Sequence, residues 1–318
     1  MPDDGRLSQT VPGRRVKYLG AFAASTLLAL VALYGYLSMT ARPASEHPYF
    51  ARESRPPRTL VIAHRGGAGL WPENTMHAYE RALALGVDVL EIDVRKTADG
   101  ELVVIHDRTV ERTTDGSGFV NTLKLSELKR LDAGFRWTAD GGRSFPLRGR
   151  GLTVPTLGEV FARLPAARFN IEPKDESSET AERLCKLVRE RGMTERVVVG
   201  SFRQSLIEEF RRACPEVATA AGPVEAGKFL ALYRAGLAAS FSPAMQALQI
   251  PERAGGVRVL TAEFVAAARE RNLQVHAWTI NDEAAMRRLI EAGVDGIMTD
   301  YPDRLLALAG RPVAGGKE

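Results

Sequence analysis

The sequence is short of cysteine, with only Cys185 and Cys214 among its 318 residues. Neither residue belongs to a C-x-x-C pair, which excludes a zinc ribbon or a thioredoxin-like redox motif. Both fall in segments with helical patterning, so buried structural cysteines are the favoured interpretation. A disulfide between them would require an exported domain, because disulfides persist in oxidising compartments. The sequence leaves that choice open.

The chain also lacks an excess of either charge after its first 58 residues. Residues 1–58 hold eight Lys/Arg and four Asp/Glu, and the remaining 260 hold 35 of each sign. A neutral folded part argues against a nucleic-acid-binding domain. The basic excess lies in the N-terminal region, where it suits a tail beside an anionic membrane. Internal repeats and low-complexity runs are absent too, which leaves a single large domain.

Residues 18–39 carry no charge and are predominantly apolar, and a stretch of 22 residues is long enough to cross a bilayer about 30 Å thick. We therefore predict a basic tail over 1–17, a transmembrane signal anchor over 18–39 and a Pro-rich linker over 40–58. The competing interpretation is a cleaved signal peptide, but residues 40–44 match an A-x-A cleavage site poorly. The basic cluster Arg14–Lys17 favours a single-pass protein whose catalytic domain is extracytoplasmic.

From residue 59 to 310, short apolar runs alternate with amphipathic helical stretches, which predicts a parallel α/β fold. The helices include 75–85, 178–191, 205–213, 262–271 and 283–292. Nine candidate strands occur, at 60–63, 89–94, 101–105, 168–172, 197–201, 217–220, 247–250, 275–279 and 296–299. Residues 107–153 contain no clean strand–helix unit and are expected to be an insertion, and residues 311–318 a C-terminal tail.

One of the nine strands is a hairpin arm. Asp99-Gly100 is a preferred two-residue hairpin turn, and it leaves no room for a crossover helix before residues 101–105. Eight strands then remain, the number that a TIM-type (β/α)8 barrel needs. A two-residue turn would also place His106 opposite Asp93, with Cβ atoms about 4.5–5.5 Å apart.

Ionisable residues gather at the carboxyl ends of these strands, which form the active face of a TIM barrel. Glu91 and Asp93 share one face of a strand, and Glu172 ends the next barrel strand. Three neighbouring carboxylates would repel one another unless a divalent cation neutralised them. A site with oxygen ligands alone favours Mg²⁺, Ca²⁺ or Mn²⁺ over zinc.

Positive charge and titratable imidazoles lie beside these acids. Arg65 and Lys174 supply cations for a phosphate group. His64 and His106 are able to act as general acid and base near neutral pH. Glu73 and Asn74 are further candidates for substrate binding, although Asn74 would also serve as a helix N-cap. Asp300 ends the last strand at the same face, and capping of the closing loop before Pro302 is the alternative to a role in the site.

These residues lie in a series of motifs that resembles the glycerophosphodiester phosphodiesterase family over residues 59–307. The motifs are HRGG from His64, PENT from Pro72, EIDV from Glu91, TADG from Thr97, VIHD from Val104, NIEPK from Asn170, AWTIN from Ala277 and GVDGIMTDYP from Gly293. The resemblance implies a TIM-type barrel that hydrolyses glycerophosphodiesters to glycerol 3-phosphate and an alcohol. It also implies His64 and His106 as the catalytic pair, Glu91, Asp93 and Glu172 as metal ligands, Arg65 and Lys174 as phosphate-binding residues, and Trp278 in the glycerol pocket.

We therefore expect a metal-dependent phosphodiesterase that acts on glycerophosphodiesters, or on lysophospholipids presented at the membrane. Two alternatives are a phospholipase C- or D-type enzyme on a related barrel, and a non-catalytic membrane protein that binds phosphodiesters. The intact histidines and carboxylates speak against the second alternative.

Overall fold

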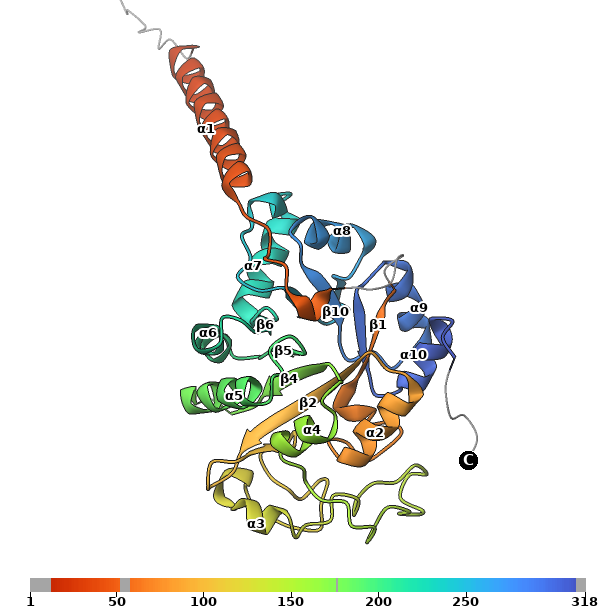
Figure 1. Cartoon of the computed structure of the whole chain (residues 1–318). Helices are drawn as coiled ribbons and strands as arrows, with labels where there is room; N and C mark the ends of the chain where they lie inside the picture. The colour runs from red at the N-terminus through yellow and green to blue at the C-terminus, as the bar shows by residue number, and fades with distance from the viewer. Residues whose placement is uncertain (1–12, 52–57, 176, 313–318) are drawn as a thin grey trace, which may run out of the picture.

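Eight parallel strands form a barrel in the computed structural model, which describes residues 13–51, 58–175 and 177–312 (Figure 1). Neighbouring strands follow the order β6-β5-β4-β2-β1-β11-β10-β7, and a parallel bridge between Ala220 and Ala247 joins the two ends. This confirms the predicted TIM-type barrel. The strands are β1 (Leu60–Ala63), β2 (Val89–Lys96), β4 (Phe169–Pro173), β5 (Val197–Val199), β6 (Ala218–Thr219), β7 (Ala247–Ile250), β10 (Gln274–Ala277) and β11 (Gly296–Thr299).

Helices follow the barrel strands and cover the outside of the barrel (Figure 1). Several begin at a side chain that caps the first turn, as Thr75, Thr156 and Asp282 do. The predicted helices agree with the structure to within two residues at each end. The helices are α2 (Met76–Leu85), α4 (Leu157–Arg163), α5 (Ser178–Glu190), α6 (Gln204–Ala213), α7 (Pro223–Arg234), α8 (Ala262–Glu270), α9 (Glu283–Glu291) and α10 (Pro302–Leu308).

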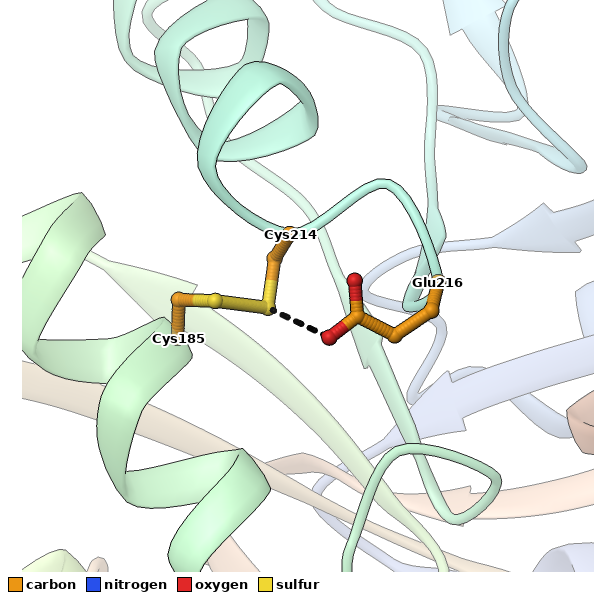
Figure 2. Close-up of side chains that lie close together, drawn as sticks. All are labelled: Cys185, Cys214 and Glu216. Atoms are coloured by element: carbon orange, nitrogen blue, oxygen red, sulfur yellow. Dashed lines mark hydrogen bonds between the residues drawn. A yellow bond between two sulfur atoms is a disulfide. The ribbon is translucent and has the colours of Figure 1, made fainter.

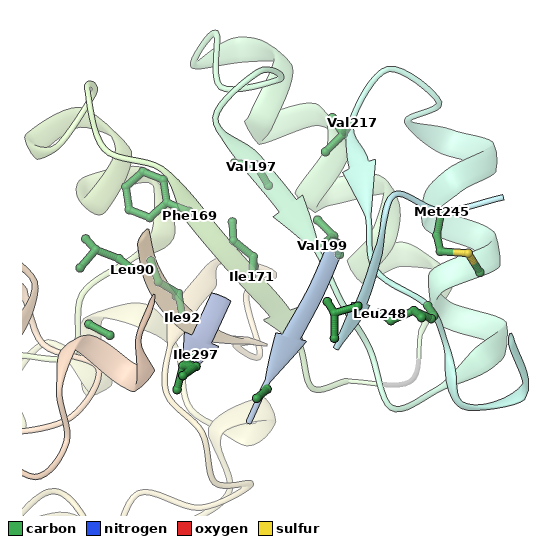
Figure 3. Packing of buried hydrophobic residues seen from close by; sticks show 14 of the residues in the cluster. Leu90, Ile92, Phe169, Ile171, Val197, Val199, Val217, Met245, Leu248 and Ile297 are labelled. Atoms are coloured by element: carbon green, nitrogen blue, oxygen red, sulfur yellow. The ribbon is translucent and has the colours of Figure 1, made fainter. Parts of the chain in front are cut away.

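The main core lies between the barrel and the helices. Alternate residues of each strand point into it, as Leu90 and Ile92 of β2 and Phe169 and Ile171 of β4 do (Figure 3). The intervening residues of the same strands face the inside of the barrel. Because Glu91, Asp93 and Glu172 occupy intervening positions, the strand alternation directs all three toward the barrel axis.

The hairpin of β2 and β3 (Leu102–Val104) corrects the predicted register by one residue. Val94 pairs with Val104, Arg95 with Val103 and Lys96 with Leu102. The turn is a three-residue loop over 98–100, in which Gly100 adopts a φ of 86°. Asp93 therefore faces Ile105, whose backbone N–H donates to the Asp93 carbonyl at 3.1 Å, and the prediction that His106 stands opposite Asp93 is wrong.

The predicted insertion contains a short 3-10 helix, η3 (Val120–Thr122), and one turn of α-helix, α3 (Leu125–Leu128). Its apolar side chains form a separate small core with the edge of the hairpin. That core consists of Val103, Ile105, Val110, Val120, Leu128, Ala133 and Val154.

The N-terminal helix α1 (Gly13–Thr40) extends away from the barrel (Figure 1). It begins five residues before the predicted anchor. Within it, Tyr18–Thr40 is 23 residues long with a mean hydropathy of 1.7, enough by length and composition to cross a membrane. A signal sequence near an N-terminus has the same character.

Residues 41–51 form a strap that packs against the amino-terminal end of the barrel, which differs from the predicted linker. Tyr49, in the 3-10 helix η1 (Pro48–Phe50), is 1% exposed and packs with Val198 and Ala218 inside the base of the barrel. Ala44 N–H donates to the Arg271 carbonyl at 2.9 Å. Of the remaining predicted linker, residues 52–57 lie outside the described part of the chain.

Cys185 of α5 and Cys214, at the C-terminal end of α6, form a disulfide with a Cα–Cα distance of 5.6 Å (Figure 2). The bond joins two neighbouring helices on the outside of the barrel. Glu216 Oε1 lies 3.8 Å from Cys214 Sγ. Sulfurs joined to each other are not available as thiolate ligands, so this group is a crosslink rather than a metal site.

Candidate active site

A tight turn after β1 places the first two candidate residues. His64 and Arg65 belong to the 3-10 helix η2 (His64–Gly66), in which Arg65 has a left-handed φ of 52°. This uncommon conformation for a non-glycine residue directs the Arg65 N–H to Glu91 Oε2 at 2.8 Å. The next residue, Gly66, has a φ of 81°, and a Cβ there would lie 2.9 Å from Ala78 Cβ. Glycine thus allows the turn to pack closely on α2.

The three candidate metal ligands converge at the carboxyl ends of β2 and β4. Asp93 and Glu172 are register partners on these adjacent strands, and Glu91 lies one inward position before Asp93. One carboxylate oxygen from each lies within 4.8 Å of the other two. The structure thus brings together the acids that the sequence pattern predicted to share one rim.

Burial and mutual repulsion disfavour the charged forms of these three carboxyl groups. Burial, reinforced by the Asp93 charge, raises the pKa of Glu91. Burial also raises the pKa of Glu172, although Lys174 opposes the shift. Burial works against the charged form of Asp93 as well, but Lys174 and Arg65 outweigh it and lower the pKa of this carboxyl. A bound cation would stabilise all three charged forms.

Two cations already lie against these acids. Lys174 Nζ is 2.9 Å from Asp93 Oδ1 and 2.8 Å from Glu172 Oε1, and Arg65 Nε is 3.1 Å from Asp93 Oδ2. Asp93 Oδ1 is buried and, despite the Lys174 contact, has no hydrogen bond of good geometry. Both cations are therefore close enough to the carboxylates to contact a phosphate held there.

Each candidate catalytic histidine is held by an aspartate. His64 Nδ1 lies 2.7 Å from Asp300 Oδ1, and His106 Nδ1 lies 2.7 Å from Asp107 Oδ1. The Nε2 atom of each ring is left for chemistry, and His64 Nε2 is 4.0 Å from Glu91 Oε2. Sequence reasoning missed this function of Asp300 and Asp107, although Asp107 directly follows His106 and Asp300 ends a barrel strand.

The two imidazoles have oppositely shifted pKa values. Burial disfavours the His64 cation, but the Glu91 charge and the Asp300 hydrogen bond outweigh it, so the pKa of His64 is raised. Burial prevails at His106 over the attraction of Asp107, and the pKa of His106 is lowered. Opposite shifts of this kind suit a pair that divides acid and base roles.

His106 reaches the site by a different route from the predicted one. The hairpin ladder ends at Val104, and the Arg95 Nε–H donates to the His106 carbonyl at 2.8 Å. This bond holds the backbone where the chain leaves the strand, and His106 lines the same cavity as His64. The side chain is thus placed by the bend over residues 106–108 that follows the strand rather than by cross-strand pairing.

Glu73 and Asn74 lie behind the site rather than in the cavity lining. Asn74, 3% exposed, donates through Nδ2 to Asp93 Oδ2 at 3.0 Å and accepts from the Tyr79 hydroxyl at 2.8 Å. Glu73 Oε1 accepts from Arg65 Nη1 at 3.0 Å. Both side chains orient residues of the site, which differs from their predicted contact with substrate. The helix N-cap is Thr75.

Arg112 of the insertion connects the two histidine regions. Its guanidinium donates to Glu73 Oε2 at 2.7 Å and to Asp107 Oδ2 at 2.6 Å. A continuous chain of ion pairs thus runs from Arg65 through Glu73 and Arg112 to Asp107 and then to the His106 ring. The sequence offered no signal for Arg112, because Glu73 lies 39 residues before it and no local pattern shows that the two side chains meet.

The cavity has a volume of about 360 Å³ and two unlike walls. The polar wall consists of charged and titratable side chains, namely His64, Arg65, Glu91, His106, Glu172 and Lys174. Trp278 belongs to an apolar wall, where its ring packs edge-on against Phe202 with centroids 5.1 Å apart. That apolar wall consists of Phe202, Ala221, Pro223, Ile250, Pro251 and Trp278. His276, in contrast, is 1% exposed and belongs to the barrel interior.

The donor set fits a divalent cation. Three carboxylates and two cations leave a net charge of −1 in a buried place, and Asp93 Oδ1 has no well-formed hydrogen bond. Oxygen ligands alone suit Mg²⁺, Ca²⁺ or Mn²⁺. Glu91, Asp93 and Glu172 are thus a set that could bind such an ion.

A barrel that carries two imidazoles, three carboxylates and two cationic side chains at one mouth has the groups that hydrolysis of a phosphoric diester requires. Residues 64–304 match the glycerophosphoryl diester phosphodiesterase family, whose members are generally dependent on a divalent metal. The chain belongs to this family, as the motif series predicted.

Individual relatives agree with this assignment. The chain is 37% identical over 256 residues to a glycerophosphodiester phosphodiesterase of Caldanaerobacter subterraneus subsp. tengcongensis, covering 79% of this chain and 98% of that one. It is 26% identical over 303 residues to lysophospholipase D GDPD1 of Mus musculus, covering 87% and 94%. The structure of an Oleispira antarctica phosphodiesterase in complex with the product sn-glycerol-3-phosphate matches with a TM-score of 0.65, 26% identity and coverage of 80% and 97%.

Proposed function

We propose that this enzyme hydrolyses glycerophosphodiesters to glycerol 3-phosphate and an alcohol with His64 and His106 as the general acid–base pair. The observation that carries the proposal is the carboxylate cluster beside two imidazoles, each held at Nδ1 by an aspartate. A held Nδ1 fixes the tautomer and orientation of the ring, which prepares Nε2 for proton transfer.

Other residues of the site bind the phosphate group, the metal ion and the apolar parts of the substrate. Arg65 and Lys174 bind the phosphate oxygens and stabilise the charge that develops on them. Glu91, Asp93 and Glu172 hold one divalent cation, Mg²⁺, Ca²⁺ or Mn²⁺, which supplies Lewis-acid stabilisation when bound. Trp278 lines the side of the cavity where the apolar faces of glycerol or of the leaving alcohol would lie.

Lysophospholipids are the second candidate substrates. The apolar wall of Phe202 and Trp278 would accommodate alkyl carbon, and the apolar N-terminal helix would keep the enzyme near lipid. The similarity to a protein named lysophospholipase D supports the same extension.

We also propose that residues 18–39 are an uncleaved anchor and that residues 59–310 form the extracytoplasmic catalytic domain. The Cys185–Cys214 disulfide supports this orientation, because cytosolic thiols are kept reduced. Alkylation of intact cells with a membrane-impermeant maleimide at an introduced surface cysteine would test it. Labelling only after cell lysis would overturn the orientation.

A turnover assay tests the chemistry. The full chain in detergent is incubated with glycerophosphocholine, glycerophosphoethanolamine or lysophosphatidylcholine, with each of the three ions and with a chelator. We expect glycerol 3-phosphate from the first two substrates, and none after chelation. Release of phosphocholine would indicate the phospholipase C alternative, and activity that survives complete chelation would refute the metal-dependent route.

Two substitutions test the histidines. His64→Ala and His106→Ala should each reduce kcat by at least about 100-fold, since general acid–base groups contribute about 10²–10⁴. His77→Ala, on the outer helix α2, is the matched control and should keep full activity. Near-normal turnover in either active-site variant would remove that histidine from the mechanism.

A further inference from the structure

The last turns of α1 lie against the segment that follows α7. The Tyr34 hydroxyl donates to the Gly236 carbonyl at 3.2 Å, and Arg42 N–H donates to Ser242 Oγ at 3.2 Å. Tyr34 and Ser38 are half-buried by this contact, whereas Leu33 and Met39 on other faces are 52% and 83% exposed. The apolar helix is thus joined to the barrel along one side and not only through its end.

The segment in contact is itself apolar. We call residues 230–240 the α7 corner, since they comprise the end of α7 and the 3-10 helix η4 (Ala238–Ser240). Between Lys228 and Glu252 the only charged side chain is Arg234, in a chain that is 26% charged. Ala231, Ala235 and Gly236 are exposed, and the leucines and alanines around them are half-buried.

The position of this corner along α1 sets its depth relative to a membrane. Tyr34 precedes Thr40 by six residues, or about 9 Å of helix rise. The apolar span Tyr18–Thr40 includes both residues. Apolar protein segments in the interface are buried about 5–10 Å into the boundary between headgroups and acyl chains. A corner level with Tyr34 therefore lies at the depth of that boundary when α1 spans the bilayer.

The strap holds the end of α1 against the barrel, next to the α7 corner. Asn272 Nδ2 donates to the Ala44 carbonyl at 2.8 Å, and Gln246 Nε2 donates to Ser45 Oγ at 3.0 Å. Tyr49 then fills the base of the barrel. The chain directly after α1 is thus bonded to the barrel at several points, which limits how far the end of α1 can move away from the barrel.

We propose that the α7 corner inserts into the interface of the bilayer that α1 spans, and that its partner is lipid. The inference rests on the proposed membrane anchoring. Leu237 and the exposed alanines would face acyl carbon near the headgroups, while Arg234 would extend its guanidinium to anionic phosphates. The barrel would then have two membrane contacts and a defined orientation.

The same contact limits the distance from the bilayer to the active site. The corner is the C-terminal end of α7, and the N-terminal end of this helix, with Pro223 and Ala226, lines the catalytic cavity. Twelve residues of α-helix span about 18 Å. The cavity therefore lies no more than about 18 Å from the membrane interface.

Depth-dependent fluorescence quenching tests the proposal. The full chain carrying Ala235→Cys is labelled with an environment-sensitive dye without reductant, so that the Cys185–Cys214 disulfide stays closed. It is reconstituted at one chain per lipid nanodisc. Ala162→Cys is the matched control, because Ala162 is exposed and belongs to α4, the helix that Figure 1 shows on the far side of the barrel from α1.

We expect a blue-shifted emission at position 235 and loss of most of its intensity with nitroxide-bearing lipids, with neither effect at position 162. Equal behaviour of the two positions in membrane-integrated protein would overturn the inference. A shift that appears only when two chains share a disc would also overturn it, because the partner would then be a second copy. Release of the protein from membranes by alkaline carbonate would instead refute the anchoring itself.

Discussion

Substitution of Asp300 by asparagine should separate the positioning of His64 from the integrity of the fold. In the wild type, Asp300 Oδ1 is bonded to His64 Nδ1 at 2.7 Å, and Oδ2 accepts from Asn281 Nδ2 at 2.6 Å. If the new amide oxygen keeps the Asn281 bond, its NH₂ group points at Nδ1. His64 would then carry its proton on Nε2, the wrong tautomer for a base, and would lose a charge that favours the imidazolium.

The expected loss follows from that one bond. A hydrogen bond to a charged group contributes about 1.5–3 kcal/mol, which corresponds to about 10- to 150-fold in rate. We expect kcat for glycerophosphocholine to fall within this range, with KM little changed. The free energy of unfolding should change by about 1 kcal/mol or less, because the isosteric side chain keeps the Asn281 contact.

Kinetics, thermal unfolding and ¹⁵N NMR of the His64 ring would be measured together, with Asp140→Asn on the exposed turn of the insertion as the control. The wild type should show Nδ1 protonated and the variant Nε2 protonated. Unchanged kcat, or a loss of kcat without any change in the tautomer, would refute the positioning role of Asp300.

Three further predictions concern parts of the chain outside the cavity. Arg112→Ala should lower kcat about tenfold with little change in melting temperature, because it breaks the chain of ion pairs behind His106. Arg163→Ala, at an exposed ion pair, is the control and should have no effect on kcat. Equal activity of the two variants would contradict this role of Arg112. Replacing both Cys185 and Cys214 by serine should reduce the free energy of unfolding by about 3–4 kcal/mol in denaturant titrations, because their 29-residue separation closes a long loop; an unchanged midpoint would mean that the bond does not form. Tyr49→Ala should reduce the free energy of unfolding by about 3–5 kcal/mol, because it leaves a cavity at the base of the barrel. Tyr49→Phe should leave this free energy almost unchanged, because the buried Tyr49 hydroxyl has no hydrogen-bond partner among the described residues. Similar losses in both variants would argue against cavity formation as the cause.

The barrel was predictable because its strands are short apolar runs separated by amphipathic helices, and such runs need only local pattern to be recognised. The gathering of Glu91, Asp93 and Glu172 followed from the same pattern, since parallel strands end at one rim. In both cases the information lies within a few neighbouring residues.

The hairpin register was not predictable in the same way. Asp99-Gly100 occurs both in two-residue turns and in three-residue loops whose last residue is left-handed. The Thr97 hydroxyl, which donates to Asp99 and accepts from Glu101 N–H, stabilises the longer loop. A single residue of loop length changes the partner of every residue in the ladder.

Contacts between segments that are distant along the chain also could not be predicted from the sequence. The prolines of residues 40–58 predicted a linker, and nothing local to Tyr49 indicated that it would fill the base of the barrel. The Asp300–His64 pair joins residues 236 positions apart, and only the closure of the barrel brings them together. The cysteine pairing depended in the same way on the packing of α5 against α6.

Anomalous diffraction from crystals soaked in Mn²⁺ tests most directly whether Glu91, Asp93 and Glu172 bind one catalytic cation. We expect one anomalous peak within ligand distance of all three carboxylates, and we expect Glu172→Gln to weaken or remove it. A peak only elsewhere, or none at these carboxylates under conditions in which the crystals turn over substrate, would contradict it.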